Sequence, residues 1–276
     1  MTEERTERIL LIGGTAAISI GFLGPVLYMI AVGFSRSPDL LGGDMARMLT
    51  LSNFVNVVTG KNLHFLAYLR NSLIVSALSA CICVAVAGMA AYAITRIRFR
   101  GSLTVMIVVL AVSMFPQISL VGYLFRLISG LGWINTHQGL VFPYAAWILP
   151  LSLWILVSYF AQIPRGLDIA ARIDGCNHWQ ILTRIIVPVA APGLFSTALL
   201  AFIFGFNEFM FALMLTTDYH ARTVPVGIAL FQGLHGQIPW GTIMAASVVT
   251  TAPVVVLTLI FQRYIVQGLT RGAVKG

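Results

Sequence analysis

The sequence predicts an all-α, polytopic membrane protein that crosses the bilayer six times. Hydrophobic residues make up 58% of its 276 residues and charged residues only 9%, whereas soluble domains carry about a quarter charged residues. The mean hydropathy is +0.91. Six apolar segments are each long enough to cross a hydrocarbon layer about 30 Å thick as a helix, and little chain remains for a soluble enzyme domain. We therefore expect a single membrane domain over residues 1–276.

The six apolar segments follow one another with short loops between most of them. The first comes after Arg5 and Arg8, but it is longer than a secretory signal and lacks a convincing small-residue cleavage site, so we interpret it as a retained helix. Prolines interrupt the third, fourth and sixth segments, which fits either a translocation path or ordinary helix kinks. The expected spans are residues 9–32, 73–94, 103–128, 140–160, 194–215 and 244–264, with a cytoplasmic loop over 161–193.

The placement of basic residues predicts the orientation. If the spans alternate, eleven Lys and Arg residues lie on the side of the two termini and six on the other side. The compact cluster of Arg96, Arg98 and Arg100 is hard to place outside the cell. Both termini are therefore expected in the cytoplasm. The net charge of +8 does not indicate nucleic-acid binding, because the chain has no run of five or more basic residues.

Motifs of enzymes and metal sites are absent from the sequence. It contains no Gly-x-x-x-x-Gly-Lys-Ser/Thr phosphate loop, no Gly-x-Ser-x-Gly elbow and no His-Glu-x-x-His, and its five histidines are dispersed. Cys81, Cys83 and Cys176 have no spacing typical of a disulfide framework or a shared metal. We expect no catalytic residue, no metal and no cofactor, and any ATP would be bound by a separate subunit.

Residues 167–192 predict two short helices joined by a turn. Pro164 suits a first helical turn, Asp168 lies where it favours the helix dipole, and Gly175 is a natural left-handed cap. A second helix would begin near Asn177 and end by Pro188. Adjacent alanines would give the first helix a low surface that another protein can approach closely. On composition alone, an amphipathic connector on the membrane surface is the commoner structure.

Residues 169–188 resemble the EAA loop of ABC-importer permeases, in which Glu-Ala-Ala is followed by three residues, Gly and a hydrophobic run ending in Pro. In that family, the loop sits in a cleft of the ATPase subunit and transmits its closure to the spans. Ile169 occupies the position of the family's glutamate, and Asp168, one residue earlier, would point about 100° away on a helix. The resemblance assigns the ATPase-coupling loop to Asp168, Ile169, Ala170, Ala171, Asp174 and Gly175.

Further motifs, in matching order along nearly the whole chain, are similar to the carbohydrate-uptake, MalG-like branch of these inner-membrane permeases. They are Asn71-Ser72, Ala90-Ala91-Tyr92-Ala93 with Arg96 and Phe99, Leu131-Gly132-Trp133-Ile134-Asn135-Thr136, Phe206-Asn207-Glu208-Phe209, Thr223-Val224-Pro225-Val226-Gly227 and Phe261-Gln262-Arg263-Tyr264. The resemblance implies a type I ABC-importer permease fold in a bacterial or archaeal plasma membrane. It also implies a sugar-transport function without enzymatic activity of its own.

The resemblance also implies partners. These are a homologous second permease subunit (MalF-like), an ATPase dimer (MalK-like), an extracytoplasmic sugar-binding protein, membrane lipid and a carbohydrate substrate. The carboxy-terminal tail, with Lys275 and Gly276, would reach into the ATPase dimer. The loop between the fifth and sixth spans would face the binding protein with Gln232, Gly233 and Gly236, unless it is a plain connector.

Asn207 and Glu208 lie inside the fifth span, where a carboxylate is costly and normally faces a bundle interior or a water-filled path. Substrate contact, gating and a structural hydrogen bond between helices are all compatible with this position. Four aromatic residues near the external mouth could stack on sugar rings, although interfacial anchoring is the commoner role of such residues. They are Tyr123, Trp133, Tyr144 and Trp147.

Two other transport functions remain open. The chain could belong to an importer for a glycerol phosphodiester or a polyol instead of a di- or oligosaccharide. Alternatively, an ion-coupled secondary carrier could use Glu208 as its coupling acid, in which case transport would follow an ion gradient and need no ATPase. The sequence does not identify the sugar.

Overall fold

The computed structural model describes residues 2–36, 49–60, 63–97, 99–231 and 238–273, and all its regular elements are helical. Four helices are long and apolar enough to cross a membrane. Two further pairs qualify only if each bent pair counts as one span, so the structure holds four to six candidate spans. The all-α fold is as predicted, whereas the count of six spans and the single domain over 1–276 stay predictions.

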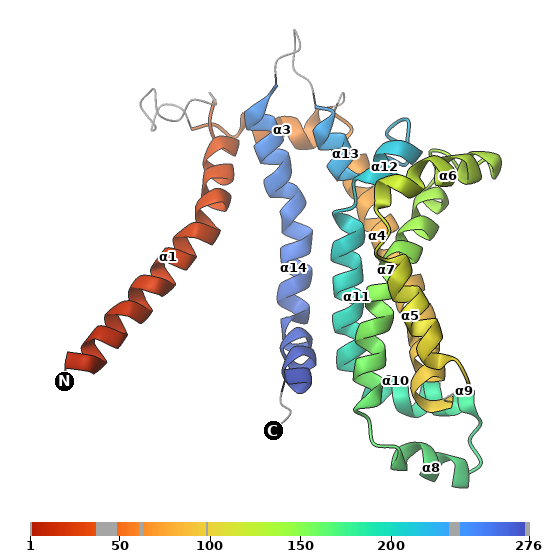
Figure 1. The fold of residues 1–276 in the computed structure, drawn as a ribbon. Helices are drawn as coiled ribbons and strands as arrows, with labels where there is room; N and C mark the ends of the chain where they lie inside the picture. The colour runs from red at the N-terminus through yellow and green to blue at the C-terminus, as the bar shows by residue number, and fades with distance from the viewer. Residues whose placement is uncertain (1, 37–48, 61–62, 98, 232–237, 274–276) are drawn as a thin grey trace. The chain divides into compact units, whose positions relative to one another are not determined.

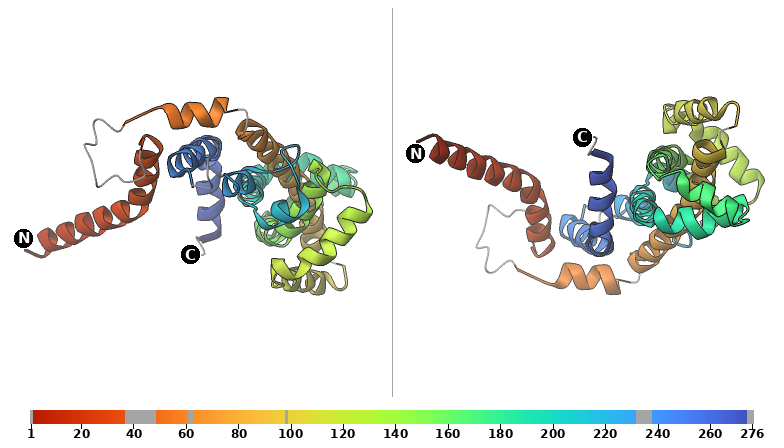
Figure 2. Two further views of the ribbon diagram at one scale, coloured as in Figure 1. Left: turned by 90° about the horizontal axis from the view of Figure 1, so that it is seen from above. Right: turned by 90° about the horizontal axis from the view of Figure 1, so that it is seen from below.

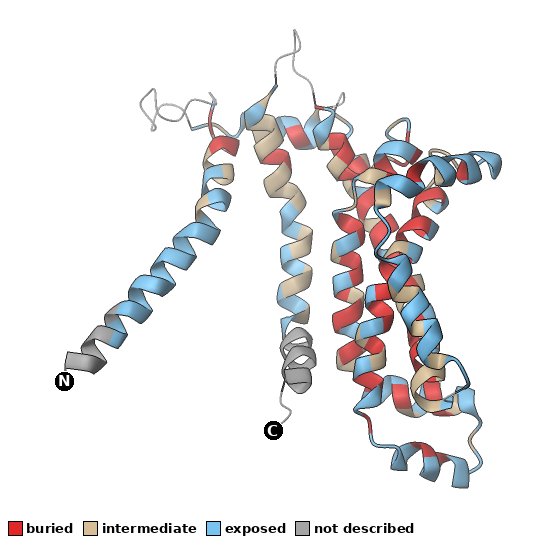
Figure 3. Ribbon diagram, viewed as in Figure 1, coloured by how far each residue is buried: buried red, intermediate tan, exposed pale blue. Residues whose placement is uncertain are grey.

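The chain forms two compact units, each described separately here. Unit 1 comprises residues 1–66 and 228–253, with α1 (Thr2–Gly33), α3 (Ser52–Thr59) and the first part of α14 (Trp240–Ala273). Most of the described side chains of α1 are exposed, except toward its carboxy-terminal end (Figure 3), as expected of a helix that is apolar all round and meets lipid. Within this unit, the Asn53 side chain donates to the carbonyls of Gly33 and Ser35 at 3.0 and 2.8 Å.

Unit 2, residues 67–227 and 254–276, contains the bundle that positions the candidate sites (Figure 1). Its most buried helix, α7, packs against α11, α12 and α5, and Figure 2 shows the bundle from both ends. Small residues let helix backbones approach closely, and those with a hydroxyl can also hydrogen-bond across the interface. Ser79, for example, donates to the carbonyl of Val141 at 3.1 Å. The main helices are α4 (Phe65–Tyr92), α5 (Ser102–Val112), α6 (Gln117–Gly130), α7 (His137–Ala161), α11 (Ala191–Phe206), α12 (Met210–Leu215) and α13 (Val224–Ala229).

Two of the predicted spans are not continuous helices. The predicted span 103–128 is divided into α5 and α6, which meet at 94°. The break falls at Phe115-Pro116, where proline lacks the amide proton that a continuing helix needs. The predicted span 194–215 is divided into α11 and α12 around residues 207–209. The sequence does not predict this second break, because no proline marks it.

Residues of several family motifs form hydrogen bonds between α4, the start of α7 and the connection that joins α12 to α13. The Asn71 amide donates to the carbonyls of Tyr219 and Arg222 at 2.9 and 3.1 Å, and the Val224 amide donates to the Ser72 hydroxyl at 2.8 Å. Asn135 adopts a left-handed φ of 57°. These residues therefore hold the connection between α12 and α13 in place.

Asp218, in that connection, is stabilised as a carboxylate. The Asn135 side-chain amide donates to its Oδ1 at 2.8 Å, and the backbone N–H and ring of His220 lie at the same distance. These hydrogen bonds lower the pKa of Asp218 to about 2. The carboxylate therefore favours the folded connection at any pH above its ordinary pKa, and this contribution is lost only as the pH falls toward 2.

Gly193 provides a test of packing between α11 and α7. A Cβ at this position would lie 2.6 Å from the ring of Tyr159, which is buried. We expect Gly193→Ala to destabilise the protein by about 1–3 kcal/mol through overpacking, measured as a lower midpoint of thermal unfolding in detergent. Gly88→Ala is the matched control, because its nearest neighbour is a Leu194 methyl at 3.9 Å. Equal midpoints for the two variants would contradict this packing.

Candidate functional site

The predicted loop consists of two short helices joined by a glycine turn. Helix α8 spans Gly166–Ile173, and α9 spans His178–Ile181 before a π-helical segment, η2 (Leu182–Ile186), and α10 (Val187–Val189). Gly175 has φ +83°, as its predicted left-handed cap requires. Asn177 begins α9 in a capping box, since its side chain and that of Gln180 each accept the other's backbone N–H at 2.9 Å.

One buried arginine holds α8 against the bundle. The Arg96 guanidinium donates to Asp168 Oδ2 and to the carbonyls of Phe160 and Ile163, all at 2.8 Å. The side chains of Arg96 and Asp168 are only 4% and 12% exposed. Phe160 and Ile163 lie at the end of α7 and just beyond it, and Arg96 lies on η1 (Ala93–Ile97), the π-helical continuation of α4. Arg96 therefore joins α4, α7 and α8.

The predicted coupling residues divide between two sides of this loop. Asp168 and Ala171 are buried, whereas Ala170, Asp174 and Gly175 are exposed. Asp168 faces the bundle, so it does not present a charge in place of the missing glutamate. Ile169, which occupies the position of the family's glutamate, is 60% exposed. Ile173, one helical turn further along α8, is 81% exposed. Trp179 of α9 is 62% exposed as well. We call these three exposed apolar side chains of the loop, Ile169, Ile173 and Trp179, the apolar loop surface.

Two π-helical segments flank the loop. They are η1 at the end of α4 and η2 after α9, and the hydroxyl of Tyr92 lies 3.2 Å from Nδ1 of His178, which connects the same two regions. Single π-turns are rare in proteins and concentrate at functional sites. In the sequence, Arg96 stands out as part of a basic cluster and of a motif, but neither predicts its bond to Asp168, 72 residues away. The sequence held one signal for this ion pair. An arginine at the end of a span and an acidic residue in a loop were predicted on the same side of the membrane.

The second candidate site is a cavity of about 390 Å³ where the broken helices meet. Glu208, in the break between α11 and α12, accepts N–H groups of Phe211 and Ala212 at 2.8 and 3.2 Å. It also accepts the side-chain amide of Gln117, the first residue of α6, at 2.7 Å. Glu208 therefore caps α12 and ties it to α6. The cavity is lined by Gln117, Tyr144, Trp147, Ile148, Phe204, Asn207, Glu208, Phe209 and Met210.

Asn207 and Glu208 both line this cavity, but they differ in exposure. Asn207 is exposed and donates to the Ile203 carbonyl at 2.8 Å, whereas Glu208 is partly buried. Among the described residues, no basic side chain forms an ion pair with Glu208. The remaining predicted site residues, Gln232, Gly233, Gly236, Lys275 and Gly276, lie outside the described residues.

The structure thus has a bundle of apolar helices with two broken segments, a largely apolar cavity that Glu208 and Asn207 also line, and an apolar loop surface. The model of one family, the binding-protein-dependent transport system inner membrane component, matches residues 62–271. Together with the family match, these features identify the class as a membrane transport permease. The chain belongs to this family. Among the residues that the structure describes, no group of three or more His, Cys, Asp or Glu side chains could hold a metal ion.

Relatives extend the match to the whole chain. It is 58% identical to the trehalose/maltose transport system permease protein MalG of Thermococcus litoralis over 277 aligned positions, with both chains covered completely. It is 39% identical to the trehalose transport system permease protein SugB of Mycobacterium tuberculosis, covering 91% of this chain and 92% of that one. The fold matches a chain of a bacterial ABC transporter that imports alginate with a TM-score of 0.79 at 20% identity, covering 96% and 98% of the two chains.

Arg96→Ala tests whether the arginine holds α8. The change leaves the Asp168 carboxylate buried without its partner, which costs about 3–5 kcal/mol for pairs of this kind. We expect a lower thermal midpoint and faster hydrogen exchange of the α8 amides. Arg165→Ala serves as control, because Arg165 is exposed and its guanidinium lies 3.5 Å from the Thr95 carbonyl. Unchanged exchange in α8 after Arg96→Ala would show that other contacts hold this helix.

Proposed function

We propose that this chain is the membrane permease subunit of an ATP-driven, binding-protein-dependent ABC importer for a di- or oligosaccharide. The full-length similarity to trehalose and trehalose/maltose permeases supports the substrate class. The observation that carries the coupling mechanism is the loop geometry, in which α8 is fixed to the bundle on one side and presents Ile169 and Ile173 on the other. ATP is bound and hydrolysed by a partner, so the chain itself is not an enzyme.

The apolar loop surface is the docking surface for the ATPase in this proposal. Exposed isoleucine and tryptophan side chains favour burial against another protein. Closure of the ATPase would push on α8, and Arg96 would pass the displacement directly to α4 and α7, because it lies on the continuation of α4 and donates to carbonyls at the end of α7. Ile169 in place of a glutamate makes this contact apolar at a position where the family presents a charge.

The cavity at Glu208 lies on the translocation path in this proposal. A carboxylate and an exposed Asn207 within a predicted span need either a bundle interior or water. Broken helices are tolerated at membrane depth where their backbone lines a cavity. A homologous second permease subunit would close the other side of the path.

The remaining partners follow from the family. An extracytoplasmic binding protein would deliver the sugar to the loop that contains Gln232, Gly233 and Gly236, and the tail with Lys275 and Gly276 would reach the ATPase dimer. Both termini would lie on the cytoplasmic side, as the distribution of Lys and Arg predicts.

Reconstitution of the complete importer in liposomes tests the proposed function. Uptake of maltose or trehalose should require ATP, the ATPase subunits and the binding protein, and collapse of ion gradients should leave it largely intact. Uptake that proceeds without ATP and follows a proton or sodium gradient would instead favour a secondary carrier with Glu208 as the coupling acid.

Ile173→Asp tests the docking surface. Because Ile173 is 81% exposed, the change should leave folding within about 0.5 kcal/mol. We expect it to weaken association with the ATPase by roughly tenfold or more, as for a residue at the centre of an interface. Co-purification and binding-protein-stimulated ATP hydrolysis measure this, and Ile173→Val should behave as wild type. Normal assembly of Ile173→Asp together with weaker membrane insertion would place the loop on the lipid surface.

A further inference from the structure

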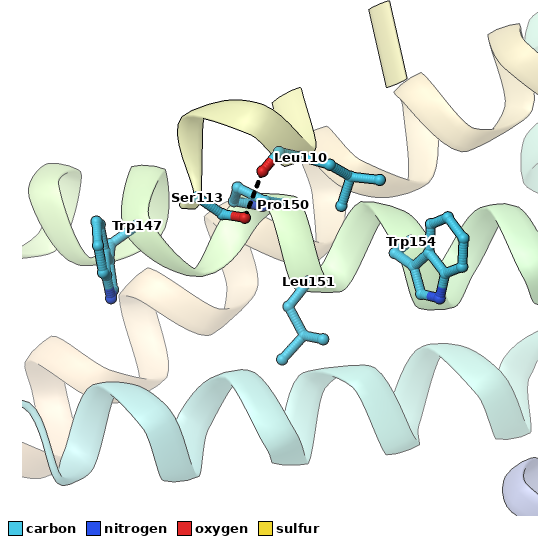
Figure 4. A pocket seen from close by; sticks show the side chains of 6 residues that line it. All are labelled: Leu110, Ser113, Trp147, Pro150, Leu151 and Trp154. Atoms are coloured by element: carbon cyan, nitrogen blue, oxygen red, sulfur yellow. Dashed lines mark hydrogen bonds between the residues drawn. The ribbon is translucent and has the colours of Figure 1, made fainter. Parts of the chain in front are cut away.

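Two cavities of unit 2 meet at the side chain of Trp147. One is the cavity at Glu208, which Trp147 lines. The other, of about 430 Å³, lies between α5 and α7. Figure 4 shows Trp147 and Trp154 at opposite ends of this second cavity, with Pro150 and Leu151 of α7 between them. Leu110 and Ser113 at the end of α5 complete its lining.

The aromatic residues at these cavities share one face of α7. Steps of three and seven residues return close to the same side of a helix, so Tyr144, Trp147 and Trp154 form a single stripe. The two tryptophans are separated by about 10 Å along the helix axis. The stripe is connected to the broken helices, because the ring of Trp147 packs edge-on against Phe211 of α12 with centroids 6.0 Å apart.

The depth of the two tryptophans argues against interfacial anchoring. Helix α7 runs from His137 to Ala161, so Trp147 is two residues from its middle and Trp154 five. Anchoring tryptophans lie at the membrane surfaces, near the ends of a span. An indole N–H in the hydrocarbon region is costly unless a polar partner is present. Trp147, which sequence analysis placed near the external mouth, therefore requires another explanation.

Polar groups accompany the stripe. Tyr144 is completely buried and lines the Glu208 cavity, and its hydroxyl faces Glu208 and Thr223. Gln117 uses its amide nitrogen on Glu208, which leaves its amide oxygen as an acceptor. Pro150 has no amide proton, so the Ala146 carbonyl four residues earlier lacks its usual helical partner. A lipid chain would satisfy none of these groups.

We propose that the stripe of Tyr144, Trp147 and Trp154 is a carbohydrate-binding subsite of the translocation path. A pyranose ring has apolar C–H faces that stack on aromatic rings and a rim of hydroxyls that donate and accept hydrogen bonds. The sugar faces would stack on the tryptophan rings, and the hydroxyl rim would bind the Gln117–Glu208 pair, which the Tyr144 hydroxyl helps to position. The subsite rests on the proposed function and assigns part of the substrate contact to this subunit.

Sugar uptake by the complete reconstituted importer tests the subsite, with maltose, trehalose and maltotriose as probes. Trp147→Ala should lower the amount of sugar transported per ATP hydrolysed by about tenfold, the upper size of a single aromatic contact, and Trp147→Phe should recover most of it. Tyr144→Phe removes only the hydroxyl and should change the uptake ratio among the three sugars. Phe142→Ala is the matched control, since this exposed aromatic lies about 140° away on the same helix and should leave that ratio unchanged.

The outcomes of this experiment distinguish a failure of the proposed subsite from a failure of the proposed importer function. Wild-type uptake and ATP stoichiometry in Trp147→Ala, with unchanged sugar ratios in Tyr144→Phe, would overturn the subsite while the importer stands. Loss of subunit assembly in Trp147→Ala and in Trp147→Phe alike would also overturn it, because the stripe would then be a contact with the second permease. If wild-type uptake needs no ATP but still falls in Trp147→Ala, the subsite stands and the importer proposal fails.

Discussion

The hydrogen bonds of Arg96 are the interaction on which the loop depends. A guanidinium that is 4% exposed needs acceptors from the protein. Here a carboxylate of α8 and two carbonyls at the end of α7 accept from Nη1 and Nη2, while Nε has no partner. The same bonds fix which side of α8 faces the bundle. Ile169 and Ile173 are consequently left on the outside, so the apolar loop surface is a result of the buried ion pair.

A related constraint determines the cavity. Backbone groups inside a membrane must find partners within the protein, and a break in a helix is stable only where its free N–H groups are bound. Glu208 binds those of Phe211 and Ala212 and also connects the break in α11–α12 to the start of α6. The loop and the cavity thus follow one principle, in which a single charged side chain holds the ends of several helices together.

Much of the fold could be predicted from the sequence, because the apolar segments, Pro116 and Gly175 act through local chemistry. The helix ends and breaks that depend on residues far away in the sequence could not be predicted. The break at Asn207 is made by Glu208 acting as a cap, and the inward direction of Asp168 is set by an arginine 72 residues earlier. The role of Trp147 could not be predicted either, because it depends on which cavities its helix borders. The resemblance to a family indicated the loop as a candidate contact with the ATPase. It did not indicate which side of α8 is exposed.

The central claim is that the apolar loop surface contacts an ATPase. The most direct measurement is cysteine cross-linking in the assembled importer, with Ile173→Cys in a chain whose Cys81, Cys83 and Cys176 are replaced by serine. The claim predicts a cross-link from position 173 to the ATPase subunit whose yield changes on ATP binding. Labelling of position 173 by a lipid-phase reagent, with no cross-link to the ATPase in any nucleotide state, would contradict it.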